Sequence, residues 1–291
     1  MLSLFHSLMA RDESRRIGAF AGWIAAATLA FIQPLTRLMV YSADSPLLSY
    51  IPLVPGVAAF LFYVQRTKLT TEYRSSIGGA VVLGGIAGAA LAAAIVLSGR
   101  LSVNDGLALT TLAYVSVIAA GGFLFLGSSW MAAAAFPIAF LLFMIPLPDV
   151  VVYWIERASV LASADVSAMF FRMTGTPLLR DGEVFALPGI VLEIARECSG
   201  IHSSWVLFIT SLVASHLFLT SPWRRFILVA FVLPLAIVRN SFRILVVGLL
   251  CVHVGPHMID SYIHRQGGPI FFALSLIPLF ILLVWLRRQE Q

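Results

Sequence analysis

Long apolar segments recur along the chain and are separated by short polar connections. A helix needs about 20 apolar residues to cross the hydrocarbon core of a bilayer, and most of these segments reach that length. Because lipid cannot satisfy backbone N–H and C=O groups, the segments are expected to be helices. The pattern predicts an all-α polytopic membrane protein with about eight transmembrane helices, at residues 17–40, 47–65, 77–98, 107–128, 130–147, 198–220, 224–251 and 268–287.

The longest segment outside the predicted spans covers residues 148–197. Its first half, 149–172, has apolar residues at helical spacing and predicts one or two helices lying on the membrane surface. An Asp-Gly pair at 181–182 separates two β-prone runs, and Leu-Pro-Gly at 187–189 precedes a third. Asp-Gly between such runs is a hairpin signal, so we expect a small extracytoplasmic β-hairpin ahead of residue 198.

Composition agrees with this pattern. The 291 residues are 60% hydrophobic and 11% charged, with a mean hydropathy of +0.95, whereas soluble domains carry about 25% charged residues. The net charge is +5, but the basic residues are scattered at the ends of apolar runs and form no groove for nucleic acid. Two cysteines are too few for a disulfide framework.

The distribution of Lys and Arg predicts the orientation of the chain. With the N-terminus inside, the outer loops carry only Arg37, Arg100 and Arg265. The inner segments carry Arg11, Arg15, Arg16, Arg66, Lys68, Arg74, Arg224, Arg225, Arg287 and Arg288. We therefore expect a multi-pass protein of the cytoplasmic (inner) membrane with both termini in the cytoplasm. No cleavable signal peptide is expected, because the first apolar run continues as a full span.

Reactive side chains gather in IARECSGIHSSW, residues 194–205, at the outer end of span six. Cys198 would lie in the first turn of that helix, where unpaired N–H groups and the helix dipole favour a thiolate. Gly200 would permit another backbone to approach closely. The alternative is that Cys198 is a small buried hydrophobe, the interpretation we keep for Cys251, which has no polar neighbours in the sequence.

Span seven contains Arg239, Asn240 and Arg243 among Leu, Val, Ile and Phe residues. Charged groups inside a membrane are costly and usually mark function. The two arginines are four residues apart and share one helix face, with Arg243 about 12 Å from the outer end of the span. Their alternative roles are snorkelling toward the interface or a structural ion pair.

The last outer loop, residues 253–272, contains His253, His257 and His264. Zinc is an alternative there, but Gly-Pro at 255–256 interrupts the only helical His spacing, so we expect neither metal nor cofactor. His264 lies on the same side of the membrane as Cys198 in this topology. A thiolate nucleophile, an imidazole that carries protons and a guanidinium that stabilises an oxyanion together favour acyl-transfer chemistry.

Three short motifs occur in order across the last three spans. They are Glu197-Cys198-Ser199-Gly200-Ile201-x-Ser203, Asn240-x-x-Arg243-Ile244 and His264-x-x-x-Gly268. The ordered set, which covers residues 178–275, resembles the exosortase/archaeosortase family of membrane cysteine transpeptidases. The resemblance implies Cys198 as nucleophile, Arg243 as the arginine that stabilises the oxyanion and His264 as acid and base.

The resemblance also implies the partners. They are exported proteins with a C-terminal PEP-like (PEP-CTERM) motif, a hydrophobic span and a basic tail, together with membrane lipid and an exopolysaccharide or lipid-linked acceptor. His202 stands where relatives often carry Arg or Gln, so it could assist or replace His264. The supporting residues are Glu197, Ser199, Gly200, His202, Arg239, Asn240 and Gly268.

We treat residues 1–291 as one integral membrane domain, in which 148–197 is an extracytoplasmic insertion and 198–287 holds the catalytic spans. Two other classes of function stay open. One is a different membrane acyl or glycan-lipid transferase that uses the same cysteine. The other is an anion transporter or scaffold. Against it, the sequence shows no inverted repeat and predicts no pair of broken helices.

Overall fold

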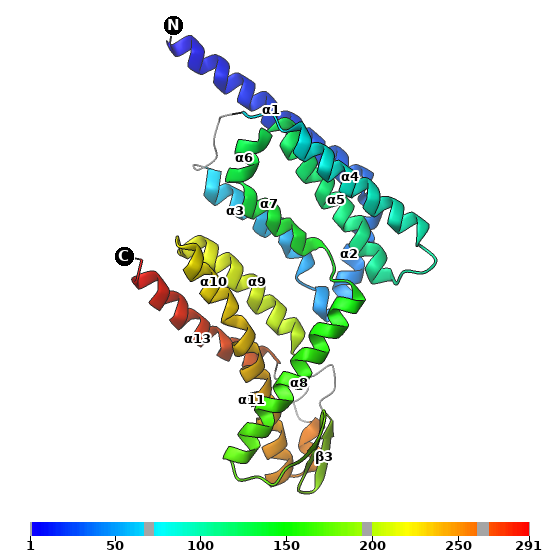
Figure 1. The fold of residues 1–291 in the computed structure, drawn as a ribbon, viewed down its shortest axis with the longest axis vertical. Helices are drawn as coiled ribbons and strands as arrows, with labels where there is room; N and C mark the ends of the chain where they lie inside the picture. Colours follow the sequence, from blue (N-terminus) through cyan, green and yellow to red (C-terminus); the bar gives the residue numbers. More distant parts are fainter. Residues whose placement is uncertain (1, 67–72, 194–199, 261–267, 291) are drawn as a thin grey trace. The chain divides into compact units, whose positions relative to one another are not determined.

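The computed structural model describes residues 2–66, 73–193, 200–260 and 268–290, and most of them are helical (Figure 1). The chain forms two compact units, Met1–Asp149 and Val150–Gln291. The first contains α1 (Leu2–Ala30), α2 (Ile32–Asp44), α3 (Val54–Gln65), α4 (Ile77–Val96), α5 (Val103–Phe125), α6 (Gly127–Ala133) and α7 (Ala135–Phe140), with 3-10 turns η1 (Pro46–Leu48), η2 (Ile51–Leu53) and η4 (Leu141–Met144). The second contains α8 (Asp149–Met173), β1 (Leu179–Asp181), β2 (Val184–Leu187), β3 (Ile190–Glu193), α9 (Ile201–Phe218), α10 (Pro222–Ala230), α11 (Val232–His253), η6 (Pro256–Asp260) and α13 (Gly268–Arg288).

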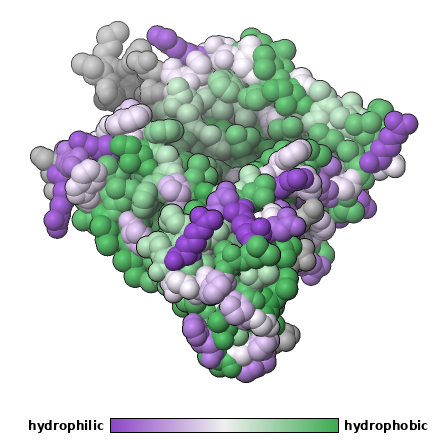
Figure 2. Space-filling view, turned by 60° about the horizontal axis from the view of Figure 1, so that its bottom comes forward, coloured by the Kyte–Doolittle hydropathy of each residue, from purple (hydrophilic) through white to green (hydrophobic). Residues whose placement is uncertain are grey.

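The predicted all-α polytopic membrane fold is confirmed. Six helical segments in the described residues are long and apolar enough to cross a membrane, and the number rises to eight if each of two bent helix pairs is one span. Apolar residues cover much of the face drawn in Figure 2, and large apolar side chains such as Val81 of α4 and Phe280 of α13 are exposed. Such exposure suits contact with lipid.

Proline sets the position of three helix breaks. The α1–α2 pair bends by 71° and the α6–α7 pair by 73°, so the expectation of no pair of broken helices is wrong. Pro34 and Pro137 each stand four residues after the last residue of the preceding helix, and Pro234 stands four residues after the end of α10. Proline lacks the N–H that would donate to that carbonyl, and its ring clashes with it, so the helix ends there.

In the first unit, α4 and α5 form an antiparallel pair whose contact is made by alanines, among them Ala87, Ala90 and Ala113. Small residues allow helix backbones to approach closely in a membrane. Helix α1 joins α5 through polar contacts. Trp23 Nε1 donates to the Val117 carbonyl at 2.9 Å, and the hydroxyls of Thr28 and Tyr114 lie 3.0 Å apart.

The predicted hairpin is present, and the third β-prone run adds a further strand. The sheet has the order β1-β2-β3 and is antiparallel throughout. Gly182 (φ +59°) opens the first turn and Gly189 (φ +82°) follows Pro188 in the second. These are the positions at which two-residue turns require positive φ, which glycine adopts at little cost.

One face of the sheet packs on α8 and α11. Its buried core contains Phe171 of α8 with Phe185 and Leu187 of β2, and Leu249 of α11 lies against it. A Cβ on Gly248 of α11 would lie 2.5 Å from the Phe171 ring, so this glycine permits the close contact. The prediction of one or two helices over 149–172 resolves into the single helix α8. Its position relative to a membrane stays a prediction.

Candidate active site

The predicted site residues divide into two groups. Gly200, Arg239, Asn240 and Arg243 lie in or beside helices of the second unit, as do His202 and Gly268. The described residues do not include Glu197, Cys198, Ser199 and His264. The geometry of the site is therefore built from the helices on either side of those positions.

Gly200 is the N-terminal capping residue of α9 and has left-handed backbone torsions, with φ +64° and ψ +13°. A Cβ at this position would lie 3.1 Å from Arg239 Nη2 and 3.2 Å from Asn240 Oδ1. Both the backbone conformation and the close contact with α11 therefore favour glycine. The sequence predicted that another backbone would approach Gly200, whereas the nearest atoms belong to the side chains of Arg239 and Asn240 on α11.

Arg239 fastens α11 to the start of α9. Its Nη2 donates to the Gly200 carbonyl and to Ser204 Oγ, each at 3.0 Å. The residue is 7% exposed, and within the described chain its buried Nη1 has no hydrogen-bond partner. A buried donor of this kind costs free energy unless it finds an acceptor. No carboxylate among the described residues pairs with Arg239, so the alternative of a structural ion pair finds no support there.

Asn240 binds α11 to α8. Its Nδ2 donates to Ser163 Oγ at 3.1 Å. The neighbouring Ser241 donates to the Ser163 carbonyl at 3.0 Å, and Ser167 Oγ donates to the Ser241 carbonyl at 3.4 Å. All four side chains are buried. In a membrane protein such interhelical hydrogen bonds fix the register of neighbouring helices.

Arg243 lies one turn beyond Arg239 on α11 and is half-buried. The next residues, Ile244 and Leu245, pack against the cluster formed by α8 and the sheet. The ring of Phe242 meets Phe271 of α13 edge-on, with centroids 6.2 Å apart. Within five residues, α11 therefore contacts the beginnings of both α9 and α13.

His202 and Gly268 occupy the first turns of α9 and α13. His202 Nδ1 is buried, and the described residues supply no hydrogen-bond partner for it. Gly268 has open space where a Cβ would stand. Cys251 is a free, buried thiol of α11, which confirms its interpretation as a small hydrophobe.

No group of three or more His, Cys, Asp or Glu side chains in the described part of the chain could hold a metal ion. His253 ends α11 and His257 lies in η6, beyond the Gly255 turn. The carboxylate of Asp165 on α8 pairs instead with Arg180 of β1 at 2.6 Å.

The sequence interpretation missed the serines of the site. Ser163 and Ser167 are four residues apart on the predicted helix 149–172, which places them on one face. Ser204 likewise lies four residues after Gly200. Serines at this spacing beside a predicted intramembrane Asn and Arg are the signal that could have found them.

The family model of the transmembrane exosortases matches residues 41–281. No curated protein matches the chain. No solved structure matches it either.

Proposed function

Because the chain belongs to the transmembrane exosortase family, we propose that it is a membrane cysteine transpeptidase that cleaves C-terminal sorting signals of exported proteins. The substrates would carry a PEP-like motif, a hydrophobic span and a basic tail. Cleavage would take place on the outer side of the cytoplasmic membrane. In this proposal Cys198 is the nucleophile, His264 the acid and base, and Arg243 the oxyanion stabiliser.

One observation carries the proposal: α11 contacts the beginnings of α9 and α13 within a single helical turn. Arg239 binds Gly200 at the start of α9, and Phe242 contacts Phe271 near the start of α13. Two of the three motifs lead into the starts of α9 and α13, and the third, Asn240-x-x-Arg243-Ile244, lies in the part of α11 that contacts them. An arrangement that unites motifs distant in sequence supports a shared site on α11.

Chain connectivity brings Cys198 close to that site. Cys198 precedes Gly200 by two residues, so their Cα atoms can be at most about 7 Å apart. Arg243 lies about 6 Å along α11 from Arg239, toward the sheet. The strand β3 ends at Glu193, and its Leu192 belongs to the apolar cluster against which Ile244 and Leu245 of α11 pack. Both guanidinium groups are therefore candidates for contact with the thiol. We assign the oxyanion to Arg243 because it belongs to the Asn240-x-x-Arg243 motif, whereas Nη2 of Arg239 is already bound to Gly200 and Ser204.

The proposed reaction proceeds through a thioester. The Cys198 thiolate attacks the carbonyl carbon of the scissile peptide bond, and the new C–S bond leaves negative charge on the oxygen. Arg243 stabilises that oxyanion with a permanent positive charge and a planar set of donors. The C–N bond then breaks as His264 protonates the leaving amine. Water or an acceptor amine finally attacks the thioester and releases the thiolate.

Arg239 has a different role in this scheme. Its hydrogen bonds to Gly200 and Ser204 hold the beginning of α9 against α11. It therefore positions the chain next to Cys198, whereas Arg243 would act on the oxyanion. The two arginines should respond differently to substitution by lysine.

A processing assay tests these assignments. An exported reporter with a PEP-like motif, a hydrophobic span and a basic tail is co-expressed with each variant, and the cleaved fraction is normalised to the amount of membrane protein. Cys198→Ser and Cys198→Ala should abolish cleavage, while the buried Cys251→Ser should retain it. Full processing by Cys198→Ala would exclude covalent thiol catalysis.

The same assay separates the arginines. An oxyanion donor contributes about 100- to 1000-fold in rate, so Arg243→Lys should fail nearly as badly as Arg243→Ala. Arg239→Lys retains a cationic donor and should mainly lower protein amount. If Arg239→Lys abolished processing at normal abundance while Arg243→Lys were tolerated, the roles assigned to the two residues would be reversed.

A further inference from the structure

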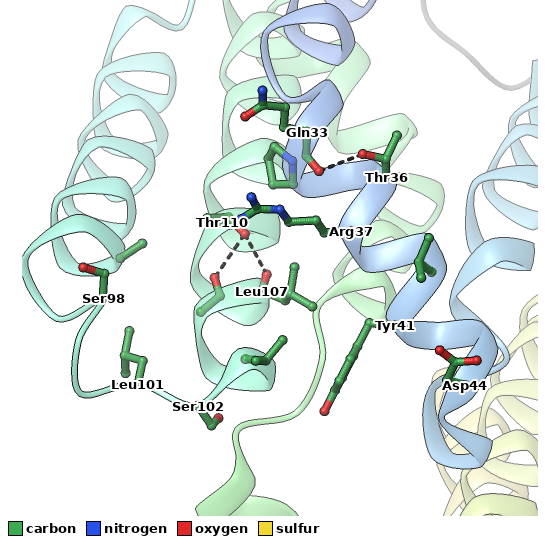
Figure 3. A pocket seen from close by; sticks show the side chains of 15 residues that line it. Gln33, Thr36, Arg37, Tyr41, Asp44, Ser98, Leu101, Ser102, Leu107 and Thr110 are labelled. Carbon is green, nitrogen blue, oxygen red and sulfur yellow. Dashed lines mark hydrogen bonds between the residues drawn. The ribbon is translucent and has the colours of Figure 1, made fainter.

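A cavity of about 780 Å³ is lined by residues of the first unit, and none of them belongs to the helices that carry the proposed active site. It is bounded by α2, by the connection between α4 and α5, and by the first two turns of α5 (Figure 3). Binding sites for drug-sized ligands are typically about 300–1,000 Å³. The cavity is therefore large enough for an organic ligand.

Three hydrogen-bond donors line one wall of the cavity. Gln33, Arg37 and Tyr41 are spaced four residues apart on α2, so they share one face of the helix. Figure 3 shows their side chains extending from α2 toward α4 and α5. None of the three side chains has a hydrogen-bond or ion-pair partner among the described residues. These three exposed or partly exposed donors make no hydrogen bond within the described residues, so they are available to a ligand rich in acceptors.

Arg37 gives this wall its charge. It is the single cation among the described residues that line the cavity. It lies seven residues before the end of α2, or about 10 Å along the helix axis. Helix α2 belongs to a bent candidate membrane span. A guanidinium at that distance from a helix end is costly in a membrane unless it faces water or an anion.

The opposite wall is largely apolar. It is formed by α4, α5 and their connection, and its apolar residues are Ala94, Leu101, Val103 and Leu107. The hydroxyl of Thr110 is already used, because it donates to the carbonyls of Gly106 and Leu107 at 3.1 Å. A ligand that matches both walls has a compact anionic group joined to hydrocarbon.

Asp44 limits the charge of the ligand. It is the only carboxylate among the described lining residues and lies at the end of α2, two turns from Arg37. A ligand with several negative charges would meet repulsion there. One phosphodiester group, with its two non-bridging oxygens at Arg37, satisfies the donors without extending a second charge to Asp44.

From these features we propose that the cavity binds a membrane phospholipid. The phosphodiester accepts hydrogen bonds from Arg37, Gln33 and Tyr41, and an acyl chain lies along the apolar wall. Free phosphate shares the headgroup chemistry but leaves that wall uncovered. The site is independent of the proposed peptide cleavage, since none of its lining residues belongs to the second unit.

Native mass spectrometry of the purified full-length protein tests the proposal. The protein in detergent is titrated with dimyristoylphosphatidylglycerol, with dimyristoylglycerol and with inorganic phosphate. We expect the phospholipid to bind at least tenfold more tightly than the diacylglycerol, and phosphate alone to bind more weakly still. If diacylglycerol bound as tightly as the phospholipid, the phosphate group would make no contribution to binding and the proposal would be wrong. Equal binding of inorganic phosphate would make it a free-anion site.

Variants localise the binding. Arg37→Gln should weaken phospholipid binding at least tenfold and Arg37→Lys less. Arg100→Gln, in the nearby α4–α5 connection but outside the cavity lining, should leave binding unchanged. If Arg37→Gln does not fold, Tyr41→Phe removes one donor at almost the same volume and should weaken binding severalfold. Equal losses in Arg37→Gln and Arg100→Gln, or unchanged binding in both cavity variants, would overturn the proposal.

Discussion

At the scale of single residues, Gly200 connects the backbone of α9 to the charged part of α11. Its positive φ and its close contact with Arg239 are two separate reasons why this position favours glycine. Gly189 provides a comparison, because it has φ +82° and open space around the position of a Cβ. The pair can separate the cost of the backbone conformation from the cost of displacing Arg239.

We predict that Gly189→Ala and Gly200→Ala both lower stability, since a left-handed conformation costs a non-glycine residue about 1–2 kcal/mol. Only Gly200→Ala should also reduce reporter processing, because its methyl group would push Arg239 and Asn240 from their positions. Melting temperature in detergent and normalised processing measure the two effects. Equal processing by both variants would show that the Gly200–Arg239 contact does not support activity.

The residue scale also shows what the sequence could predict. Arg239, Asn240 and Arg243 of span seven were recognisable because Arg and Asn are rare among Leu, Val and Ile in a membrane helix. The partners of Arg239 and Asn240 were not predicted. They are a backbone carbonyl, which has no sequence signal, and serines, which are common in membrane helices whether or not they bind a neighbour.

At the scale of helices and strands, hydropathy predicted where apolar segments lie but not where they bend. The first and fifth predicted spans, 17–40 and 130–147, are bent pairs in the structure. Hydropathy averages over a window and does not register the lost hydrogen bond of one proline. The positions of Pro34 and Pro137 carried that information. Similarly, the Asp-Gly signal predicted one hairpin, while the Pro-Gly turn at 188–189 extended it to three strands.

The end of α13 is fastened to the α9–α10 turn by one carboxylate. Glu290 accepts hydrogen bonds from the backbone N–H groups of Thr220 and Ser221, at 2.8 and 2.9 Å, and from the Thr220 hydroxyl at 3.0 Å. Arg224 lies 3.6 Å away. The two backbone N–H groups, with a smaller contribution from Arg224, lower the pKa of Glu290 from 4.5 to about 2. Ser221 caps α10, so the carboxylate also occupies the positive end of that helix.

This contact should make stability depend on pH. Because the folded state lowers the pKa, the stabilisation is complete above about pH 4.5 and is lost as the pH falls toward 2. We predict that Glu290→Gln melts below the unchanged protein at pH 7 and that the difference shrinks as the pH falls through this range. Glu183→Gln, in the β1–β2 turn, serves as the control. A difference that stayed constant between pH 6 and 3 would contradict the assigned role of Glu290.

At the scale of the second unit, basic residues and the sheet occupy opposite ends of the helices. Glu290 joins α13 to the α9–α10 turn, and the Arg287 guanidinium lies 5.8 Å from the centre of the Phe218 ring at the end of α9. This end also contains Arg224, Arg225 and Arg288. The sheet packs at the other end of α11, near Leu249 and Val252. Basic residues near helix ends favour the cytoplasmic side, so the sheet is expected outside.

Site-directed labelling tests that orientation. In a background with Cys198→Ser and Cys251→Ser, a cysteine at Glu183 in the β1–β2 turn should react with a membrane-impermeant thiol reagent in cells whose outer membrane is permeabilised. A cysteine at the exposed Ser75, before α4, should react only after lysis. Labelling of both cysteines after lysis shows that both proteins are expressed, and labelling of position 183 before lysis shows that the reagent is active. The opposite pattern would place the sheet and the beginning of α9 in the cytoplasm. An exported protein could not reach Cys198 there, so the proposed cleavage would be excluded even if the thiol were reactive.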